Sequence, residues 1–335
     1  MGILSELIND PFCEGLVRTT LSLAVGFCLV EGFLNLFRIT SARIQQFCWL
    51  AVLLLGWIWV RPSLGVTSAW SLEFFTASLA DFANHKQISL AVLFVWATGV
   101  CVVLLQALRQ YHQRCRVLSD TVEPTTDWKE QWEKITKFEN LPKPVPMRMS
   151  FSVGPTLIRR WDGYELVVPM ELWKVLEPRE RVCLLRLQSA HLRNRNPWKF
   201  LLVRLLMLPH WFNPLAWLVL DRFDRAVEFA KDEQVYHETS DSPGLLQNAL
   251  ARWKESADVR FFSERMERLE MLQQDASFAD TALQKAAVVG VLTLLFLALV
   301  VQVDSQETQT DSFIEPEITS ERTMDETPYR SAVSR

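Results

Sequence analysis

The chain has 335 residues, of which 49% are hydrophobic, and its formal net charge at pH 7 is -4. This length accommodates one membrane region and one modest folded domain. Without a basic excess, the sequence gives no support for a nucleic-acid partner, and none is expected. The six cysteines form no C-x-x-C pair and no regular spacing. This pattern predicts buried thiols rather than a disulfide framework or a cysteine zinc site.

Four stretches have the length and apolarity to cross a bilayer, whose hydrocarbon core takes roughly 20 helical residues. They are residues 19–37, 44–60, 88–108 and 286–303. The first is interrupted by Glu31, which is either a functional charge or part of a helix end displaced toward the lipid headgroups. The sequence therefore predicts a three-span region over residues 1–108 and a fourth transmembrane helix over residues 286–303.

Arginines are concentrated in the segments after the first and the third stretch, which would lie on the same side of the membrane. Arg38 and Arg43 lie between the first and the second, and three more arginines follow the third within residues 109–116. Because lysine and arginine favour the cytoplasmic side, residues 109–285 are predicted to be cytoplasmic and both termini to be outside. The first ten residues contain no lysine or arginine, so the first stretch is predicted to be an anchor rather than a cleaved signal peptide. Residues 304–335 are polar and acidic, which predicts a disordered extracytoplasmic tail.

The predicted cytoplasmic segment has an α+β pattern. Residues 147–153 and 164–168 alternate or are rich in β-branched side chains, which predicts strands. A helix is expected to begin near Pro178 and to run past His191, and further helices are expected over residues 221–236, 245–256 and 260–274. Residues 198–220 are apolar but interrupted by charged residues and prolines, which predicts an interfacial hairpin of two helices. The predicted fold class is an α-helical membrane protein with four transmembrane helices and an inserted α+β cytoplasmic domain.

Three short segments follow one another in this domain: Leu187–His191, the W-F-N-P run at residues 211–214, and E-x-x-x-D from Glu228 to Asp232. Their order resembles the gluzincin-like, integral-membrane zinc metallopeptidases typified by the BlaR/MecR beta-lactam sensor-transducers. In that family an H-E-x-x-H helix precedes W-F-N-P and a later E-x-x-x-D. The resemblance covers roughly residues 109–303. It implies a metallopeptidase-like domain in a multi-pass protein of the bacterial-type cytoplasmic (inner) membrane.

The chain departs from the family pattern at two positions that zinc chemistry needs. Leu187 stands at the first histidine position and Gln188 at the glutamate position. Leucine has no lone pair for a metal, and glutamine cannot accept a proton from metal-bound water. The resemblance then leaves His191 and Glu228 as vestigial metal ligands, with Asp232 in a supporting position, where catalytic zinc sites use three protein ligands and water. No catalytic residue and no cofactor are therefore expected.

Other interpretations of these residues compete with this one. His191 could be a buried histidine that hydrogen-bonds Glu228 or Asp232. Together with Glu233, the two acidic residues could also form a solvated helix face. His210, directly before W-F-N-P, could supply a substitute metal ligand.

Three functional hypotheses follow. The favoured one is a non-catalytic pseudo-peptidase that acts as a membrane sensor or scaffold in signal transduction, with membrane lipids and a cytoplasmic regulatory protein as partners. The alternative is an active zinc-dependent membrane endopeptidase with a non-standard metal site that cleaves a regulatory protein. A third, chance similarity in a structural membrane protein, accounts poorly for the ordered segments. No S-x-x-K motif follows the fourth predicted span, so beta-lactam sensing by acylation is not expected.

Overall fold

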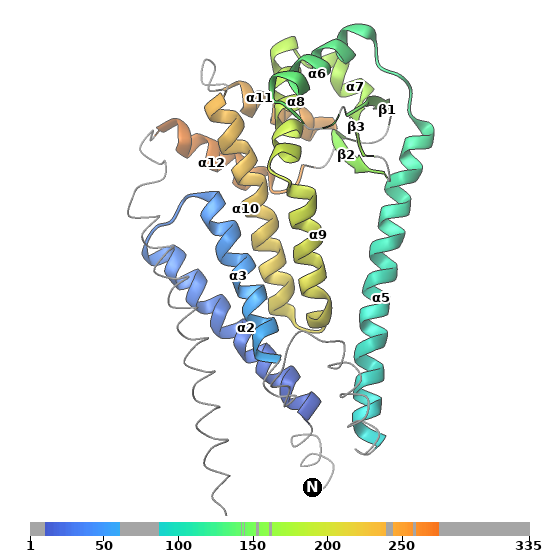
Figure 1. Ribbon diagram of the computed structural model, residues 1–335. Helices are drawn as coiled ribbons and strands as arrows, with labels where there is room; N and C mark the ends of the chain where they lie inside the picture. The colour runs from blue at the N-terminus through green and yellow to red at the C-terminus, as the bar shows by residue number, and fades with distance from the viewer. Residues whose placement is uncertain are drawn as a thin grey trace, which may run out of the picture. The chain divides into compact units, whose positions relative to one another are not determined.

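The computed structural model describes residues 11–60, 87–141, 143, 145–151, 154–160, 163–238, 244–256 and 259–274. The predicted fourth span and the predicted disordered tail lie outside these residues. Over the described part the chain is mostly helical, with one small sheet (Figure 1).

Three N-terminal helices coincide with the first three predicted spans. They are α2 (Pro11–Leu36), α3 (Ala42–Val60) and α5 (Gln87–Val117). Two of them, α2 and α5, contain stretches long and apolar enough to cross a membrane, and the apolar stretch of α3, Ala42–Gly56, is shorter. Helices α2 and α3 pack against each other along their length, and Arg38 adopts a left-handed conformation (φ 47°) in the short connection between them.

The sheet has three strands in the order β1-β3-β2. The strands are β1 (Met147–Ser150), β2 (Thr156–Arg159) and β3 (Tyr164–Pro169). β1 pairs with β3 in parallel, and β2 pairs with β3 antiparallel. β3 is buried from its second residue onward, because it lies between two partners and beneath helices. The predicted strands β1 and β3 are confirmed, whereas the sequence prediction missed the four-residue strand β2.

The remaining elements are mostly helices that pack around one hydrophobic core. In chain order they are η2 (Leu118–Asp120), α6 (Thr126–Phe138), α7 (Met170–Val175), α8 (Pro178–Arg193), α9 (Asn196–Met207), η3 (Leu208–His210), α10 (Pro214–Glu238), α11 (Leu245–Ser256) and α12 (Phe262–Gln274). The core combines Trp132 of α6 and Trp173 of α7 with apolar residues of β1, β3, α8, α11 and α12. Burial of these large side chains supplies the main stabilisation of the domain.

Helices α9 and α10 form a hairpin whose tip contains the W-F-N-P run. The Asn213 side-chain oxygen accepts a hydrogen bond from the backbone N–H of Leu215 at 2.9 Å, so Asn213 starts α10. Trp211 donates its indole N–H to the carbonyl of Trp96 on α5 at 3.1 Å. A Cβ atom on Gly99 of α5 would lie 2.0 Å from the Trp211 ring, so only glycine permits this contact. Trp96 and Gly99 lie well inside the predicted third span.

The tip of the hairpin lies beside the middle of the predicted third span, where Trp96 hydrogen-bonds the carbonyl of Pro209 and accepts a hydrogen bond from Trp211. The interfacial position expected for the hairpin stays a prediction. Helix α10 differs from its prediction, since it continues without interruption from Pro214 to Glu238, where two separate helices were expected. The composition changes along α10 because the helix packs on α2 and α3 as well as on α8 and α12. Its backbone needs no break to pass from one environment to the other.

Candidate functional site

Helix α8 carries the segment that corresponds to H-E-x-x-H. It begins at Pro178 with a capping box, in which the side chains of Glu177 and Glu180 each accept a hydrogen bond from the other residue's backbone N–H. It ends at Arg193, and Arg195 then turns the chain with a left-handed φ of 52°. The cap and the turn fix both ends of the helix. Between these ends, α8 packs against α10.

Leu187 fills the first histidine position with apolar volume. Its side chain is 1% exposed and belongs to the hydrophobic core, together with Trp132, Met149 and Leu184. Leucine at this position therefore stabilises the domain by packing. An imidazole here would lie among apolar side chains, and a polar group buried without a partner is costly.

Gln188 occupies the position of the general base and is 7% exposed. Its side-chain amide donates a hydrogen bond to the backbone carbonyl of Pro155, just before β2, at 3.4 Å. A carboxylate has no proton to donate, so an ionised glutamate could not make this bond. Gln188 thus connects α8 to the loop before β2.

On α10, both acidic residues of E-x-x-x-D are paired with cations. The Glu228 carboxylate lies 2.8 Å from the ammonium of Lys231, one turn further along α10, and 3.4 Å from the guanidinium of Arg265 on α12. Arg265 also forms two parallel hydrogen bonds to Asp232, of 2.7 and 2.6 Å. The side chains of Arg265 and Asp232 are 3% and 2% exposed. The predicted supporting residue Asp232 is therefore fully engaged by an arginine.

His191 has a different environment from the expected one. Among the described residues its hydrogen-bond partner is Asn196, whose side-chain nitrogen lies 3.5 Å from Nδ1, and its ring lies 5.7 Å from that of Phe200. The expected bonds to Glu228 or Asp232 are not made, because Lys231 and Arg265 bind those carboxylates. The interpretation of Glu228, Asp232 and Glu233 as a solvated acidic face is also wrong, since all three are largely buried and paired.

Burial and neighbouring charges set the pKa values at this place. Burial lowers the pKa of His191 to about 3, with a further decrease from the Lys231 cation and an opposing effect of Glu228. Burial raises the pKa of Glu228, but the cations of Lys231 and Arg265 and the nearby His191 outweigh it, so that the pKa falls to about 2. At neutral pH, Glu228 is therefore ionised and His191 is neutral. Helices α8 and α10 pack against each other, and His191 and Glu228 lie within electrostatic range of one another.

His210 lies too far along the chain to replace the missing histidine. It belongs to η3 at the tip of the hairpin, and a Cβ atom on Gly56 of α3 would lie 3.5 Å from its Nε2. Helix α9 lies between His191 and His210 in the chain, and its twelve residues span roughly 18 Å at 1.5 Å per residue. Among the described residues, no group of three or more His, Cys, Asp or Glu side chains is arranged to hold a metal ion.

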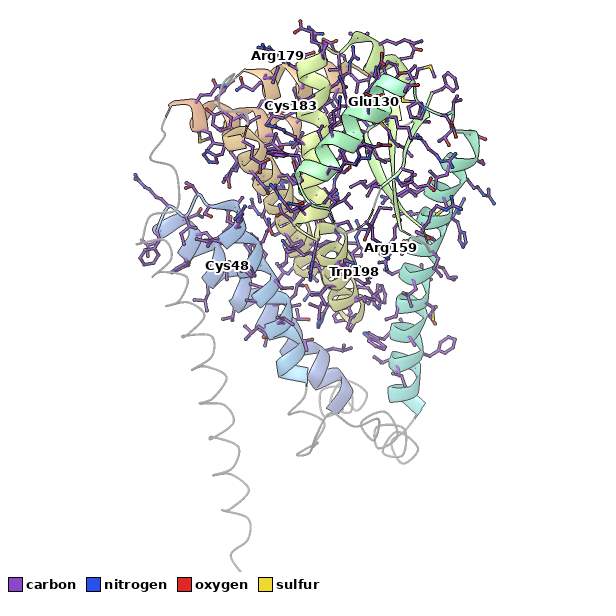
Figure 2. All side chains as sticks on the ribbon, turned by 45° about the horizontal axis from the view of Figure 1, so that its top comes forward. Cys48, Glu130, Arg159, Arg179, Cys183 and Trp198 are labelled. Atoms are coloured by element: carbon purple, nitrogen blue, oxygen red, sulfur yellow. The ribbon has the colours of Figure 1, made fainter. Side chains whose placement is uncertain are left out.

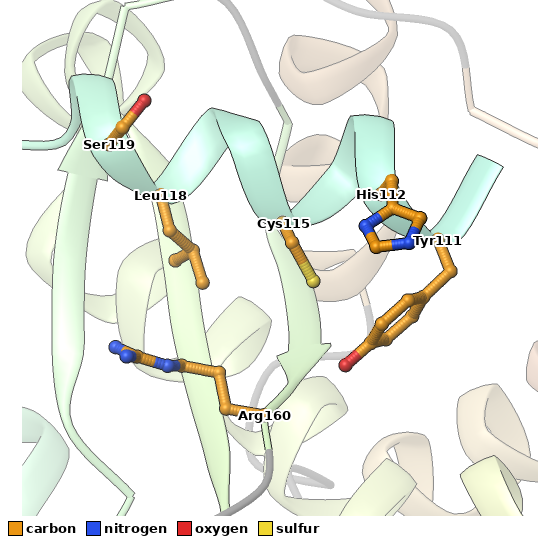
Figure 3. A pocket seen from close by; sticks show the side chains of 6 residues that line it. All are labelled: Tyr111, His112, Cys115, Leu118, Ser119 and Arg160. Atoms are coloured by element: carbon orange, nitrogen blue, oxygen red, sulfur yellow. The ribbon is translucent and has the colours of Figure 1, made fainter. Parts of the chain in front are cut away.

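A separate pocket lies where the end of α5 faces the turn after β2 (Figure 3). It is lined by Tyr111, His112, Cys115, Leu118, Ser119 and Arg160. Near it, the guanidinium of Arg159 stacks over the Trp198 ring at 4.1 Å and so connects β2 to the start of α9 (Figure 2). None of the residues that line this pocket belongs to the group around Glu228.

Sequence reasoning placed Leu187, Gln188, His191, Glu228 and Asp232 in one region but missed the two cations. Lys231 had a detectable signal, because residues three apart on a helix face each other. Arg265 had none, since its pairing depends on how α12 packs against α10.

Helix α8 and the following α9–α10 hairpin, which carries W-F-N-P and E-x-x-x-D, define a metallopeptidase-like domain. The model of the BlaR1 peptidase M56 family matches residues 76–242, about half of the chain. The chain belongs to this membrane-associated family, which confirms the resemblance inferred from its motifs. The match includes every residue of the candidate site except Arg265. No curated protein matches the chain.

Proposed function

We propose that this chain is a non-catalytic membrane sensor or scaffold that retains the M56 peptidase fold. The observation that carries the proposal is the pairing of Glu228 with both Lys231 and Arg265. A zinc ion bound by Glu228 would lie close to two fixed positive charges. Leu187 contributes core volume where a ligand is needed, and Gln188 cannot serve as the general base. The side chains present do not fit a catalytic zinc ion.

Direct contacts between the membrane region and α10 support a role in signal transduction. Glu31 of α2 forms an ion pair with Arg222 of α10 at 3.1 Å, which accounts for an acidic residue inside the first predicted span. The side chain of Gln46 on α3 donates a hydrogen bond to the carbonyl of Ala226 at 3.1 Å. A displacement of α2 or α3 would therefore reach the helix that carries Glu228 without an intermediate element.

The α2–α3 connection is also held by α12. The guanidinium of Arg268 hydrogen-bonds the carbonyl of Thr40 and the carboxylate of Glu233. Arg268 lies one turn after Arg265, so α12 contacts both the membrane region and the buried acidic residues of α10. We infer that a cytoplasmic regulatory protein is the partner that would respond to movements of these helices.

The proposed topology has four transmembrane helices in a bacterial-type inner membrane, with both termini outside. Its support is the arginine distribution and the exposed apolar surface of α5, where Phe94, Val95 and Leu105 are each more than 60% exposed. Such surface is stable when lipid tails cover it. Membrane lipids are therefore proposed contacts of this face.

The orientation predicts a labelling pattern. In a variant without the six native cysteines, an impermeant thiol reagent applied to intact cells should react with a cysteine at Ser320 and not with one at Ser256. Disrupted cells provide the control, because both positions should then react. Labelling of Ser256→Cys and protection of Ser320→Cys in intact cells would reverse the topology.

Zinc removal is expected to leave the domain folded. A site with two protein ligands contributes little folding free energy compared with a closed structural site. The purified protein should contain less than stoichiometric zinc, and a chelator should leave its thermal midpoint unchanged. A chelator-induced drop, together with zinc-dependent cleavage of a regulatory protein, would instead support an active endopeptidase with a non-standard metal site.

A further inference from the structure

Lys231 is unusual because it is a lysine buried in the middle of the candidate site. Its side chain is 8% exposed, and its ammonium lies 2.8 Å from the Glu228 carboxylate. Lysine is almost never buried unless it is paired. Here the pairing carboxylate belongs to the residue that the family pattern assigns to the metal.

The charges around Lys231 form a balanced set. Two carboxylates, Glu228 and Asp232, face two cations, Lys231 from the same helix and Arg265 from α12. His191 of α8 lies within electrostatic range of Lys231 and Glu228, and Asp224, one turn before Glu228 on α10, also interacts with Glu228 and is itself paired with Arg260. Adding a divalent cation to this set would place it close to two like charges in a partly desolvated environment, where such repulsion is strong. Removing Lys231 alone would leave one carboxylate charge unbalanced.

We infer that Lys231 is a built-in cation that takes over the structural role of a metal ion. Its ammonium neutralises Glu228 and keeps that carboxylate within reach of Arg265, so the contact between α10 and α12 persists without a bound metal. The inference rests on the proposed non-catalytic function and adds one point to it. Restoring the H-E-x-x-H histidine and glutamate should not restore a zinc site while Lys231 is present.

The zinc affinities of four proteins, three variants and the unchanged protein, measured by competition with a chromophoric chelator, test this inference. The first is Leu187→His with Gln188→Glu. The second adds Lys231→Met to these changes. The third adds Lys174→Met instead, as a matched control, because Lys174 pairs with Glu171 three residues away at 3.0 Å but on an exposed surface. The fourth is the unchanged protein.

Only the variant that lacks Lys231 should bind zinc tightly. Its affinity should exceed that of the Leu187→His, Gln188→Glu variant by about 100-fold or more, given the repulsion between a divalent ion and an ammonium at short range. The Lys174→Met control should match that double variant. Equal affinities with and without Lys231 would overturn the inference but leave the proposed function intact. Stoichiometric zinc in the unchanged protein would instead overturn the proposed function.

A second measurement does not depend on the folding of variants with a histidine in the core. In the otherwise unchanged protein, Lys231→Met should lower the thermal midpoint by about 10 °C, because Glu228 loses its nearest counter-charge in a buried place. Lys174→Met should change the midpoint by about 2 °C or less. If the two variants had the same midpoint, Lys231 would not be balancing a buried charge, and the inference would be wrong.

Discussion

Replacing Arg265 with methionine is expected to lower the free energy of unfolding by about 3–5 kcal/mol, the usual consequence of removing one partner of a buried ion pair. Arg265 makes two hydrogen bonds to Asp232 and an ion pair with Glu228, and its side chain is 3% exposed. Its loss would leave Asp232 buried without its guanidinium partner, which raises the pKa of that carboxyl further, and would leave Glu228 with Lys231 alone. Equilibrium unfolding in denaturant would measure the change.

Arg225 provides the matched control for this prediction. It also contacts two carboxylates, Asp221 at 2.9 Å and Glu264 at 3.0 Å, and Glu264 lies on α12. Because its side chain is about one-third exposed, solvent screens these pairs, and Arg225→Met should cost about 1 kcal/mol or less. Similar losses for the two variants would show that the Arg265 pairs are as well screened as those at the surface.

The sequence was informative where local signals determine the structure. Helix α8 begins at Pro178 as predicted because proline and the capping glutamates act within a few residues. Helix α11 matches its predicted range, residues 245–256, for a similar reason: Gly244 precedes it. Strand β2 was missed because four residues carry little periodicity, and its formation depends on pairing with β3.

The candidate site was predictable only in part. The spacing of Leu187, His191, Glu228 and Asp232 placed these residues correctly on two helices. The charge balance was not predictable, because Arg265 comes from α12, 33 residues after Asp232.

From the sequence alone, the effect of Glu228→Gln on stability is expected to be mild, since no metal charge is lost. The structure changes that expectation, because glutamine would leave the buried Lys231 without its carboxylate.

Leu187→Ala is expected to destabilise the domain by about 2–5 kcal/mol, the range for truncating a buried leucine. Leu187 is 1% exposed and packs in the core that joins α8 to β1, β3 and α6. Truncation removes apolar contacts and leaves a cavity where the polar neighbour Gln188 offers no replacement volume. Thermal or denaturant unfolding of the purified protein would measure the loss.

The control for Leu187 is Val175→Ala in α7, since Val175 is 64% exposed and its truncation should change stability by about 0.5 kcal/mol or less. A small effect of Leu187→Ala, comparable to that of the control, would mean that the position is not used for packing. In an active enzyme with a different third ligand, Leu187 would tolerate this change, and loss of cleavage would follow mutation of Glu228 instead. A large loss of stability at Leu187 therefore favours a domain in which the first metal-ligand position has become part of the hydrophobic core.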